Sequence, residues 1–300
     1  MNYYDLIKVG EKFLAKKKIL RPKYESILLF SKINKINFNN YFTNEKKIVS
    51  KTQASIFLKK IILRGLGKPL SKIIGKKEFY SRDFFVNTHT LDPRPETELI
   101  IDFIKNFEEN RLTPLKILDL GTGTGCIIIS LFLELNKKVN VTGDGVDVSD
   151  DALEIAKKNA RYHNISDKIN FFKSDWFSNV KNKFDIIVSN PPYIKKSEIN
   201  FLPVGVKKFD PLISLCGGHD GLTPYRKIAD KAKNYLKKDG FICVEVGNEQ
   251  SRKVKKIFEL KKFTTIDVLE DLFNIERVII FKNKIWVLFF KMLVLAFLIK

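Results

Sequence analysis

Hydrophobic positions divide the chain into two parts with different periodicities. In the first part, apolar side chains recur at helical spacing, which predicts helices over 3–17, from Pro22 through Phe30, and over 48–63. From residue 116 onward, short apolar runs alternate with amphipathic segments. That alternation is typical of a parallel sheet whose strands are joined by helices. The sequence therefore predicts a small helical domain over residues 1–68, followed by an α/β domain.

Residues 69–95 are predicted to connect the two domains. A β-hairpin is expected around Ser81-Arg82-Asp83, between two short predicted strands at 77–80 and 84–86. Two prolines then stiffen the chain, and Glu96 and Glu98 place negative charge at the start of the next helix.

A glycine-rich loop follows the first strand of the α/β part, 116–120. Gly121-Thr122-Gly123-Thr124-Gly125 separates this strand from an apolar helix, 126–135. Strand, glycine loop and helix in this order let the backbone approach a nucleotide-like ligand. The second strand ends at Asp147, which is placed to hold ribose hydroxyl groups, and Ser149 is predicted to cap the next helix.

The second strand also contains Gly143-Asp144-Gly145, which predicts a bulge or a longer loop before Asp147. Asp144 is therefore the alternative ribose ligand. A third strand, 169–173, ends in Ser174-Asp175-Trp176. Asp175 or Trp176 is placed there to contact an adenine by a hydrogen bond or by stacking.

The fourth strand, 184–188, runs into Ser189-Asn190-Pro191-Pro192-Tyr193. The prolines end the strand, and ligands of such sheets bind beyond the carboxyl ends of the strands. The Asn190 side chain and the Pro191 backbone offer carbonyl oxygens to the two N–H bonds of a planar nitrogen, such as an amide or an exocyclic amine. Tyr193 offers a ring for stacking. The alternative interpretation is a simple Pro-Pro turn.

A long loop and the last elements of the sheet are predicted after Tyr193. The loop, 194–223, contains Gly217-Gly218-His219-Asp220-Gly221, and loops of this length are often functional, for example as lids. The elements expected after it are a helix, a strand and a second helix, then an antiparallel strand pair, at 224–236, 241–246, 249–260, 264–268 and 277–281.

Composition narrows the class of protein. The formal charge of +20 fits attraction to nucleic acid or ribosome-associated partners, or a coding bias toward Lys, Asn, Ile and Phe, and the even spread of lysines favours bias. Three separated cysteines without CxxC argue against disulfides and zinc, and the three scattered histidines do not predict a metal site. The cysteine usage fits a reducing cytosol and no N-terminal signal peptide is expected, so the sequence predicts a cytoplasmic protein.

The segment from Asp119 through Gly125 resembles motif I of class I S-adenosylmethionine-dependent methyltransferases. Together with Asn190-Pro191-Pro192-Tyr193, it makes the chain similar to the protein-(glutamine-N5) methyltransferases of the HemK/PrmC type. The resemblance covers about residues 1–282 and is weakest in the N-terminal helices. It extends to segments at 67–70, 74–75, 78–79, 91–98, 174–177 and 217–222.

The resemblance implies a fold, a cofactor and a substrate. The fold is a class I methyltransferase domain over 96–282, Rossmann-like, with a mostly parallel seven-stranded sheet. The methyl donor is S-adenosyl-L-methionine, and the acceptor is the glutamine of the Gly-Gly-Gln loop in class-1 peptide chain release factors, which the helical domain, 1–68, would grip. Neither a metal nor a nucleic acid is required for this reaction.

The same resemblance assigns roles to individual residues. Gly121, Thr122, Gly123, Thr124 and Gly125 would lie along the methionine part of the cofactor. Asp147 would bind the ribose, Trp176 would border the adenine, and Asn190 would also contact the cofactor. The residues that would hold the glutamine side chain are Asn190, Pro191, Pro192 and Tyr193.

Some positions depart from the family pattern. Asp92 stands where an aliphatic residue is usual, and Asn274 occupies a usual glycine position, which Asn tolerates because it can adopt φ > 0. The tail, 283–300, has no counterpart, and its apolar stretch is shorter than the roughly 20 residues of a membrane-spanning helix. The sequence predicts no transmembrane span. A weak membrane contact, a packed helix and an extension without function stay open for the tail.

Two other functions fit part of the sequence. An adenine-N6 methyltransferase acting on DNA or RNA would also present a planar amine to Asn190, but no separate target-recognition domain follows the catalytic one. A non-catalytic binding module would keep the fold without the chemistry, and the intact glycine loop and Asn-Pro-Pro-Tyr motif argue against it.

Overall fold

The structure, a computed structural model, describes residues 1–109 and 111–284. It separates into two compact units, one formed by Met1–Lys76 with Leu202–Phe209 and the other by Lys77–Phe201 with the residues from Asp210 onward. The apolar tail, about which the sequence leaves three interpretations open, lies outside the described residues. Within the described ranges, none of the helices combines the length and the apolar character that a membrane crossing requires.

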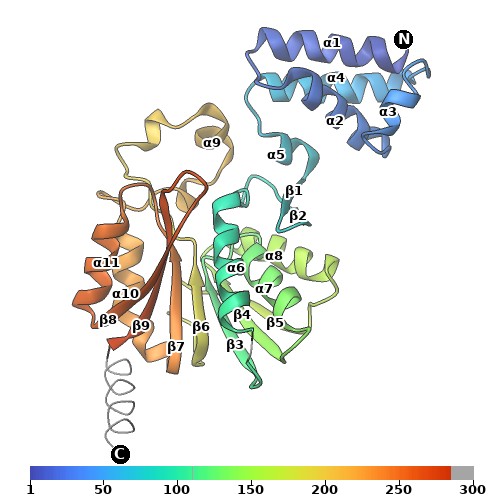
Figure 1. Ribbon diagram of the computed structural model, residues 1–300. Helices are drawn as coiled ribbons and strands as arrows, with labels where there is room; N and C mark the ends of the chain where they lie inside the picture. Colours follow the sequence, from blue (N-terminus) through green and yellow to red (C-terminus); the bar gives the residue numbers. More distant parts are fainter. Residues whose placement is uncertain (110, 285–300) are drawn as a thin grey trace, which may run out of the picture. The chain divides into compact units, whose positions relative to one another are not determined.

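The first unit is built from helices (Figure 1). They are α1 (Tyr3–Lys16), α2 (Pro22–Asn34), α3 (Asn40–Thr43), α4 (Lys51–Gly65), α5 (Leu70–Ile74) and α9 (Val204–Phe209). The three helices predicted here are present. α4 begins later than predicted because Ser50 and Gln53 form a capping box, in which Gln53 N donates to Ser50 Oγ and Ser50 N donates to Gln53 Oε1, both at 3.2 Å.

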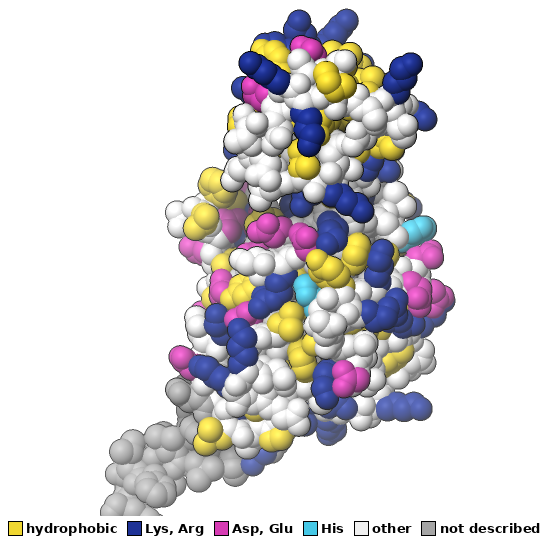
Figure 2. Space-filling view, turned by 90° about the vertical axis from the view of Figure 1, so that its right-hand side faces the viewer, with side chains coloured by type: hydrophobic (Ala, Val, Ile, Leu, Met, Phe, Trp, Pro, Cys, Tyr) yellow, Lys and Arg dark blue, Asp and Glu magenta, His cyan; other side chains and the backbone are white. Residues whose placement is uncertain are grey.

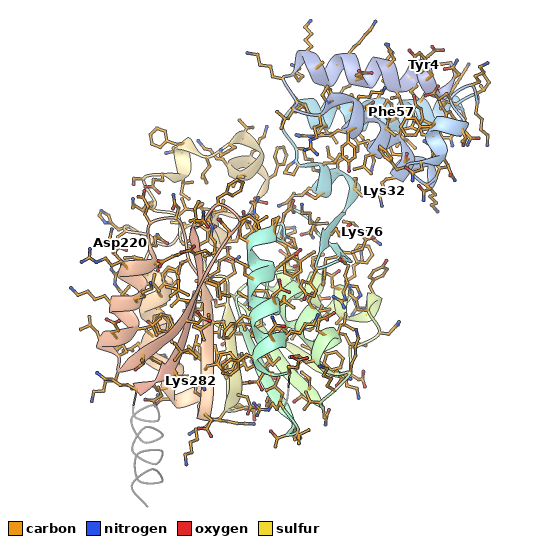
Figure 3. The ribbon with its side chains drawn as sticks, viewed as in Figure 1. Tyr4, Lys32, Phe57, Lys76, Asp220 and Lys282 are labelled. Atoms are coloured by element: carbon orange, nitrogen blue, oxygen red, sulfur yellow. The ribbon has the colours of Figure 1, made fainter. Side chains whose placement is uncertain are left out.

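The core of this unit depends on a close approach of α1 to α2 and α4. A Cβ added to Gly10 would lie 2.6 Å from Ser26 Oγ and 2.8 Å from the ring of Phe57, so only glycine fits there. Phe57 is fully buried among these helices (Figure 3), and Ser26 Oγ donates to Ile7 O at 2.9 Å.

α9 belongs to this unit although it comes from the long loop after Tyr193. Lys72 Nζ donates to the carbonyl oxygen of Phe209 at 2.6 Å, and the Cβ position of Gly67 lies 3.1 Å from Val204. The sequence predicts this segment only as a loop, because six helical residues leave no readable periodicity.

The predicted hairpin is present, but its turn is shifted. β1 (Lys76–Phe79) and β2 (Arg82–Phe85) are joined by Tyr80 and Ser81, whose φ angles are 49° and 57°. Two consecutive residues in the left-handed region form the tight turn that suits a hairpin. Such a turn usually contains glycine or asparagine at its two central positions. Neither residue occurs at 80 or 81, which explains why the turn was wrongly predicted at Ser81 to Asp83.

The second unit contains a seven-stranded sheet in the order β5-β4-β3-β6-β7-β9-β8. β5, β4, β3, β6 and β7 are parallel, and β9 is antiparallel to both of its neighbours. This confirms the predicted fold class and the closing antiparallel pair. The strands are β3 (Leu115–Leu120), β4 (Val141–Asp147), β5 (Ile169–Lys173), β6 (Phe184–Ser189), β7 (Leu236–Glu245), β8 (Phe263–Glu270) and β9 (Glu276–Asn283).

Helices cover both faces of this sheet (Figure 1). They are α6 (Glu98–Phe107), α7 (Cys126–Leu135), α8 (Asp150–Tyr162), α10 (Thr223–Tyr235) and α11 (Ser251–Leu260). Neighbouring residues of a strand enter opposite cores, since Ile117 packs with α6 and α7 while Leu118 packs with α10 and α11. Burial on both faces explains why the central strands are continuous apolar runs.

β4 runs without the bulge that its sequence predicts. Its residues pair in continuous register with β3 and with β5, so the expected bulge or longer loop at Gly143-Asp144-Gly145 is wrong. The glycines make room for packing instead. A Cβ on Gly143 would lie 2.8 Å from Ile128, and one on Gly145 would lie 2.6 Å from the ring of Phe171. Asp147 is therefore the last residue of a regular strand.

Two further expectations concern turns and strand length. Asn274 has a φ of 58°, which confirms that asparagine takes the left-handed conformation here.

β7 begins at Leu236, directly after α10, and is longer than predicted. The residues before Phe241 are polar and interrupt the apolar run from which the strand was predicted.

Candidate active site

The glycine loop between β3 and α7 uses its glycines in two ways. Gly121, Gly123 and Gly125 have φ angles of 72°, 54° and 77°, which favour glycine. No atom of residues 1–109 or 111–284 lies within 4 Å of the Cβ position of Gly121, so its backbone faces open space among the described residues. A Cβ on Gly125 would instead lie 3.0 Å from Ile129 and 3.3 Å from Ala156. Gly125 therefore lets α7 pack closely on its neighbours.

Asp147 is tied to the glycine loop. Its Oδ2 accepts a hydrogen bond from Gly123 N and its Oδ1 accepts one from Ser149 N, both at 3.0 Å. Burial raises the pKa of Asp147, and these backbone bonds lower it in part. Ser149 Oγ accepts from Ala152 N at 3.2 Å, which confirms the predicted cap of α8. The strand end and the loop thus form one preorganised unit.

The alternative ribose ligand, Asp144, lies elsewhere. It is buried within β4, and its carboxylate accepts hydrogen bonds from the side-chain amides of Asn170 at 3.1 Å and Asn182 at 3.4 Å. Of the two carboxylates, only Asp147 lines the cavity described next.

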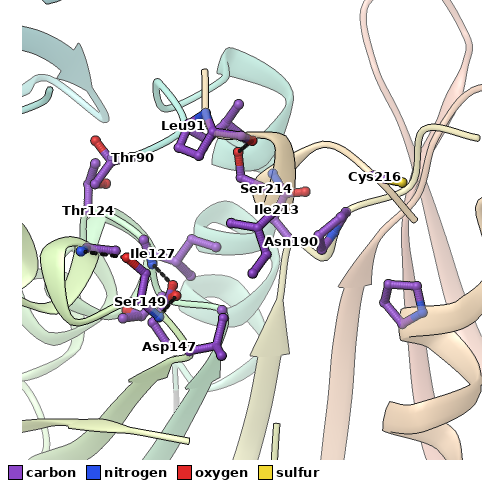
Figure 4. A pocket seen from close by; sticks show the side chains of 18 of the residues that line it. Thr90, Leu91, Thr124, Ile127, Asp147, Ser149, Asn190, Ile213, Ser214 and Cys216 are labelled. Carbon is purple, nitrogen blue, oxygen red and sulfur yellow. Dashed lines mark hydrogen bonds between the residues drawn. The ribbon is translucent and has the colours of Figure 1, made fainter. Parts of the chain in front are cut away.

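A cavity of about 510 Å³ lies at the carboxyl ends of the strands (Figure 4). Most of the predicted site residues line it, namely Gly121, Thr122, Gly123, Thr124, Asp147, Asp175, Trp176, Asn190 and Pro192. Gly125, Pro191 and Tyr193 are not among its lining residues. Other segments also contribute to the wall, namely Leu91 of the family-like segment 91–98, and Thr90, Ile213, Ser214 and Cys216, which lie outside the predicted motifs (Figure 4).

Asn190 at the end of β6 has side-chain partners that the sequence analysis missed. Its Nδ2 donates to Thr97 Oγ1 at 3.1 Å, and Thr97 Oγ1 donates to Glu245 Oε2 at 2.5 Å. Burial raises the pKa of the Glu245 carboxyl to about 7. The sequence held one signal for each partner. Thr97 lies in the family-like segment 91–98, and Glu245 is the last residue of β7, the strand beside β6.

Tyr193 supports the loop rather than the cavity wall. Its ring packs on the core beside β7 and lies 2.8 Å from the Cβ position of Gly247, and Gln250 Nε2 donates to its carbonyl oxygen at 2.9 Å. Burial raises the pKa of Tyr193 to about 12, so the phenol is neutral. The predicted stacking partner is held in place as part of a packed loop.

Gly217 and Gly221 pack directly on the backbone of Asn-Pro-Pro-Tyr. A Cβ on Gly217 would lie 2.7 Å from Pro192 O, and one on Gly221 would lie 2.4 Å from Tyr193 O. The long loop also pairs with the chain after Tyr193, since Gly217 N donates to Ile194 O at 2.8 Å. The glycine-rich segment 217–221 therefore lies directly against the Asn-Pro-Pro-Tyr segment, although the two are far apart in the sequence.

Basic side chains do not gather at one place on the face shown in Figure 2. Among the described residues drawn there, Lys and Arg are interspersed with Asp and Glu. This distribution agrees with the even spread of lysines along the sequence.

Known proteins share both the domain and its architecture. Residues 113–284 match the family model described as "Methyltransferase domain". The solved catalytic domain of hMettl16, in complex with the MAT2A 3'UTR hairpin 6, superposes with a TM-score of 0.54 at 17% identity and covers 78% of this chain and 82% of that one. At that identity the likeness concerns the fold alone.

Curated relatives identify the family more narrowly than the domain model and the fold do. The release factor glutamine methyltransferase of Agrobacterium fabrum is 35% identical over 87% of this chain and 91% of its own length. That of Pasteurella multocida is 34% identical over 93% of this chain and 98% of its own length. The bifunctional methyltransferase of Rickettsia bellii is 37% identical, but the chain spans about half of it, 51%. A match over nearly the whole length of two relatives, with the methyltransferase domain, shows that this chain belongs to the release factor glutamine methyltransferase family.

Proposed function

We propose that this enzyme transfers a methyl group from S-adenosyl-L-methionine to the side-chain nitrogen of the glutamine in the Gly-Gly-Gln loop of class-1 peptide chain release factors, in support of translation termination. The observation that carries the proposal is the position of Asn190. It lines the same cavity as the glycine loop and Asp147, so an amide acceptor and a cofactor have room to meet there.

The described residues fit S-adenosyl-L-methionine. The backbone at Gly121 and Gly123 faces space that a Cβ would enter, which suits an extended ligand lying against it. Asp147 presents a carboxylate to the cavity, as a ribose diol requires, and Trp176 offers a ring to an adenine. When bound, the cofactor would supply the methyl group of its sulfonium ion: the glutamine nitrogen would bond to this methyl group and lose one proton to solvent, while the bond from the methyl carbon to sulfur breaks and S-adenosyl-L-homocysteine leaves.

The substrate side of the cavity acts by orientation and charge. An amide nitrogen is a poor nucleophile because its lone pair is delocalised. Asn190 Oδ1 accepts from one N–H bond of this nitrogen, and the carbonyl oxygen of Pro191 accepts from the other. Both acceptors stabilise positive charge as it develops on the nitrogen. The roles of Pro191 and Tyr193 are proposals from the motif, since neither residue lines the cavity.

The helical unit is the proposed grip on the release factor. It carries exposed apolar side chains beside basic ones on α4, among them Ile56, Ile62 and Leu63, which suit contact with another protein. The cytoplasmic location predicted from the sequence agrees with a substrate that acts in translation.

Methyl transfer to a purified class-1 release factor tests the proposal, with labelled S-adenosylmethionine and with DNA and RNA assayed in parallel. Label on the Gly-Gly-Gln glutamine, located by peptide mapping and lost when that glutamine is replaced, is the expected result. Label on nucleic acid alone would overturn it and assign the cavity to adenine.

A further inference from the structure

Three side chains form a chain of hydrogen bonds that begins at the cavity wall and ends in the core. Asn190 Nδ2 donates to Thr97 Oγ1 at 3.1 Å, and Thr97 Oγ1 donates to Glu245 Oε2 at 2.5 Å. Thr97 and Glu245 are each 2% exposed. Bulk water therefore does not compete for the hydroxyl of Thr97 or the carboxylate of Glu245, and these groups must find their hydrogen-bond partners within the protein.

The buried carboxylate of Glu245 determines which group donates and which accepts in each of these hydrogen bonds. An ionised carboxylate only accepts hydrogen bonds, and a threonine hydroxyl has one hydrogen to give. Thr97 gives that hydrogen to Glu245 and offers only its lone pairs to Asn190. Asn190 must then turn its amide nitrogen toward Thr97, which leaves its carbonyl oxygen for the cavity.

We propose that Glu245, acting through Thr97, is a positioning residue that holds the Asn190 amide with its carbonyl oxygen toward the substrate nitrogen. This inference rests on the proposed function, because the orientation is useful only for a substrate that presents N–H bonds. A nitrogen that gains positive charge is stabilised by an oxygen beside it and repelled by an amide NH₂ group. Without the hydrogen bonds from Asn190 to Thr97 and from Thr97 to Glu245, the side-chain amide of Asn190 could adopt either of its two orientations.

The charges around Glu245 define the pH at which this device works. Burial is the largest cause and raises the pKa of Glu245 to about 7. Within that balance, hydrogen bonding from Thr97 lowers the pKa, the charge of Glu96 raises it, and Arg277 on β9 and the side chain of Asn190 lower it. The other titratable groups that face it are neutral at this pH, namely Tyr193, Tyr225 and Cys126. Protonated Glu245 can donate to Thr97, which frees the hydroxyl hydrogen of Thr97 for Asn190 Oδ1 and lets the amide turn around.

Methyl transfer is therefore expected to rise with pH as Glu245 loses its proton near pH 7. Asp119 complicates this profile, because burial also raises its pKa to about 7, and Thr122 Oγ1 donates to it beside the glycine loop. Cofactor affinity measured at each pH isolates the contribution of Asp119. At saturating cofactor, an effect on affinity no longer limits the rate, so the pH dependence of kcat reports the protonation of Glu245.

The test compares four variants of the full-length enzyme. Glu245→Gln removes the obligate acceptor, Thr97→Val removes the hydroxyl, and Thr97→Ser keeps it. Tyr225→Phe is the matched control, because Tyr225 OH donates to the backbone oxygen of Glu245 at 3.0 Å and leaves the carboxylate untouched. The measurements are kcat and KM for release factor methylation from about pH 6 to pH 8, cofactor affinity, and the ¹⁵N NMR signals of the Asn190 side-chain amide.

We expect Glu245→Gln and Thr97→Val to lower kcat by about tenfold or more, the effect of losing a buried hydrogen bond to a charged group. Cofactor affinity should stay unchanged, and Thr97→Ser should recover most of the rate. The rise of kcat near pH 7 should persist in Tyr225→Phe and disappear in Glu245→Gln. The Asn190 amide signals should follow the same pH dependence in the wild type.

Two results would overturn the inference while the proposed function stands. One is an active wild type whose kcat and pH profile are matched by Glu245→Gln. The other is a loss of activity in Thr97→Val that Thr97→Ser does not recover. If Glu245→Gln does not fold, the two Thr97 variants decide the question. A wild type that does not methylate the release factor contradicts the proposed function, and the NMR signals of Asn190 then test the orientation by themselves.

Discussion

The two ends of the cavity are built in different ways. The end proposed for the cofactor is lined by four consecutive residues, Gly121 to Thr124, and by Asp147, whose hydrogen-bond partners here are backbone N–H groups. The end proposed for the substrate is lined by Asn190 and Thr97, with Glu245 buried behind them, and its hydrogen bonds join side chains up to 148 residues apart. The first end depends on local backbone conformation and the second on long-range side-chain contacts. Substitutions at the first should alter mainly affinity, and those at the second mainly rate.

The largest effect is expected at the substrate end. Asn190→Ala removes an acceptor that acts on charge developing in the transition state, so kcat should fall by about 10²- to 10³-fold, by analogy with oxyanion-hole donors. Affinity for S-adenosylmethionine should stay measurable, because the glycine loop and Asp147 are untouched. Single-turnover methylation of a release factor and calorimetric titration of the cofactor check these two outcomes. Full activity in this variant would show that the cavity is wrongly assigned.

A smaller effect, on affinity, is expected at the cofactor end. Asp147→Ala should weaken cofactor binding by roughly 10- to 100-fold, since hydrogen bonds to a charged group contribute about 1.5–3 kcal/mol. At saturating cofactor, kcat should recover to within a few-fold of the wild type. Asp144→Asn is the matched control, because Asp144 lies on the same strand and does not line the cavity. Equal losses of affinity in both variants would contradict the assignment of Asp147.

The same contrast explains what was predictable from the sequence. The glycine loop, Asp147 and the Ser149 cap follow from local rules, and the sheet follows from alternating apolar runs that both faces bury. Thr97 and Glu245 were missed because their roles depend on which strand lies beside which, as β7 lies beside β6. The predicted bulge in β4 failed for a related reason. Gly143 and Gly145 were read as signs of irregular backbone, and only the neighbouring Ile128 and Phe171 show that they provide space.

The packing role of Gly143 in β4 can be tested by measuring the stability of a variant. In Gly143→Val, the new Cβ would lie 2.8 Å from Ile128 and 2.9 Å from the backbone oxygen of Ile117. Overpacking of this kind should lower the free energy of unfolding by about 1–3 kcal/mol. Thr142→Val is the control, because Thr142 is exposed on the same strand. Chemical denaturation should show a loss in the first variant only, and equal stability of both would restore the bulge as an explanation.

The smallest effect separates the two kinds of glycine within the cofactor end. Alanine at a φ of 72° or 77° costs about 1–2 kcal/mol in the left-handed region, so Gly121→Ala and Gly125→Ala should both lower the melting temperature. Gly125→Ala should lose more stability, because its Cβ would also lie 3.0 Å from Ile129, whereas the Cβ of Gly121→Ala would meet no atom of the described part of the chain within 4 Å.

Cofactor affinity should follow the opposite order. The methyl group of Gly121→Ala occupies the space proposed for the cofactor, whereas that of Gly125→Ala lies in the packing between α7 and its neighbours. The less destabilised variant should therefore be the weaker binder, a combination that a general loss of stability does not produce. Thermal unfolding and calorimetric titration of the two proteins give both quantities. If affinity instead falls in step with stability, the open backbone at Gly121 is a feature of folding and not of cofactor binding.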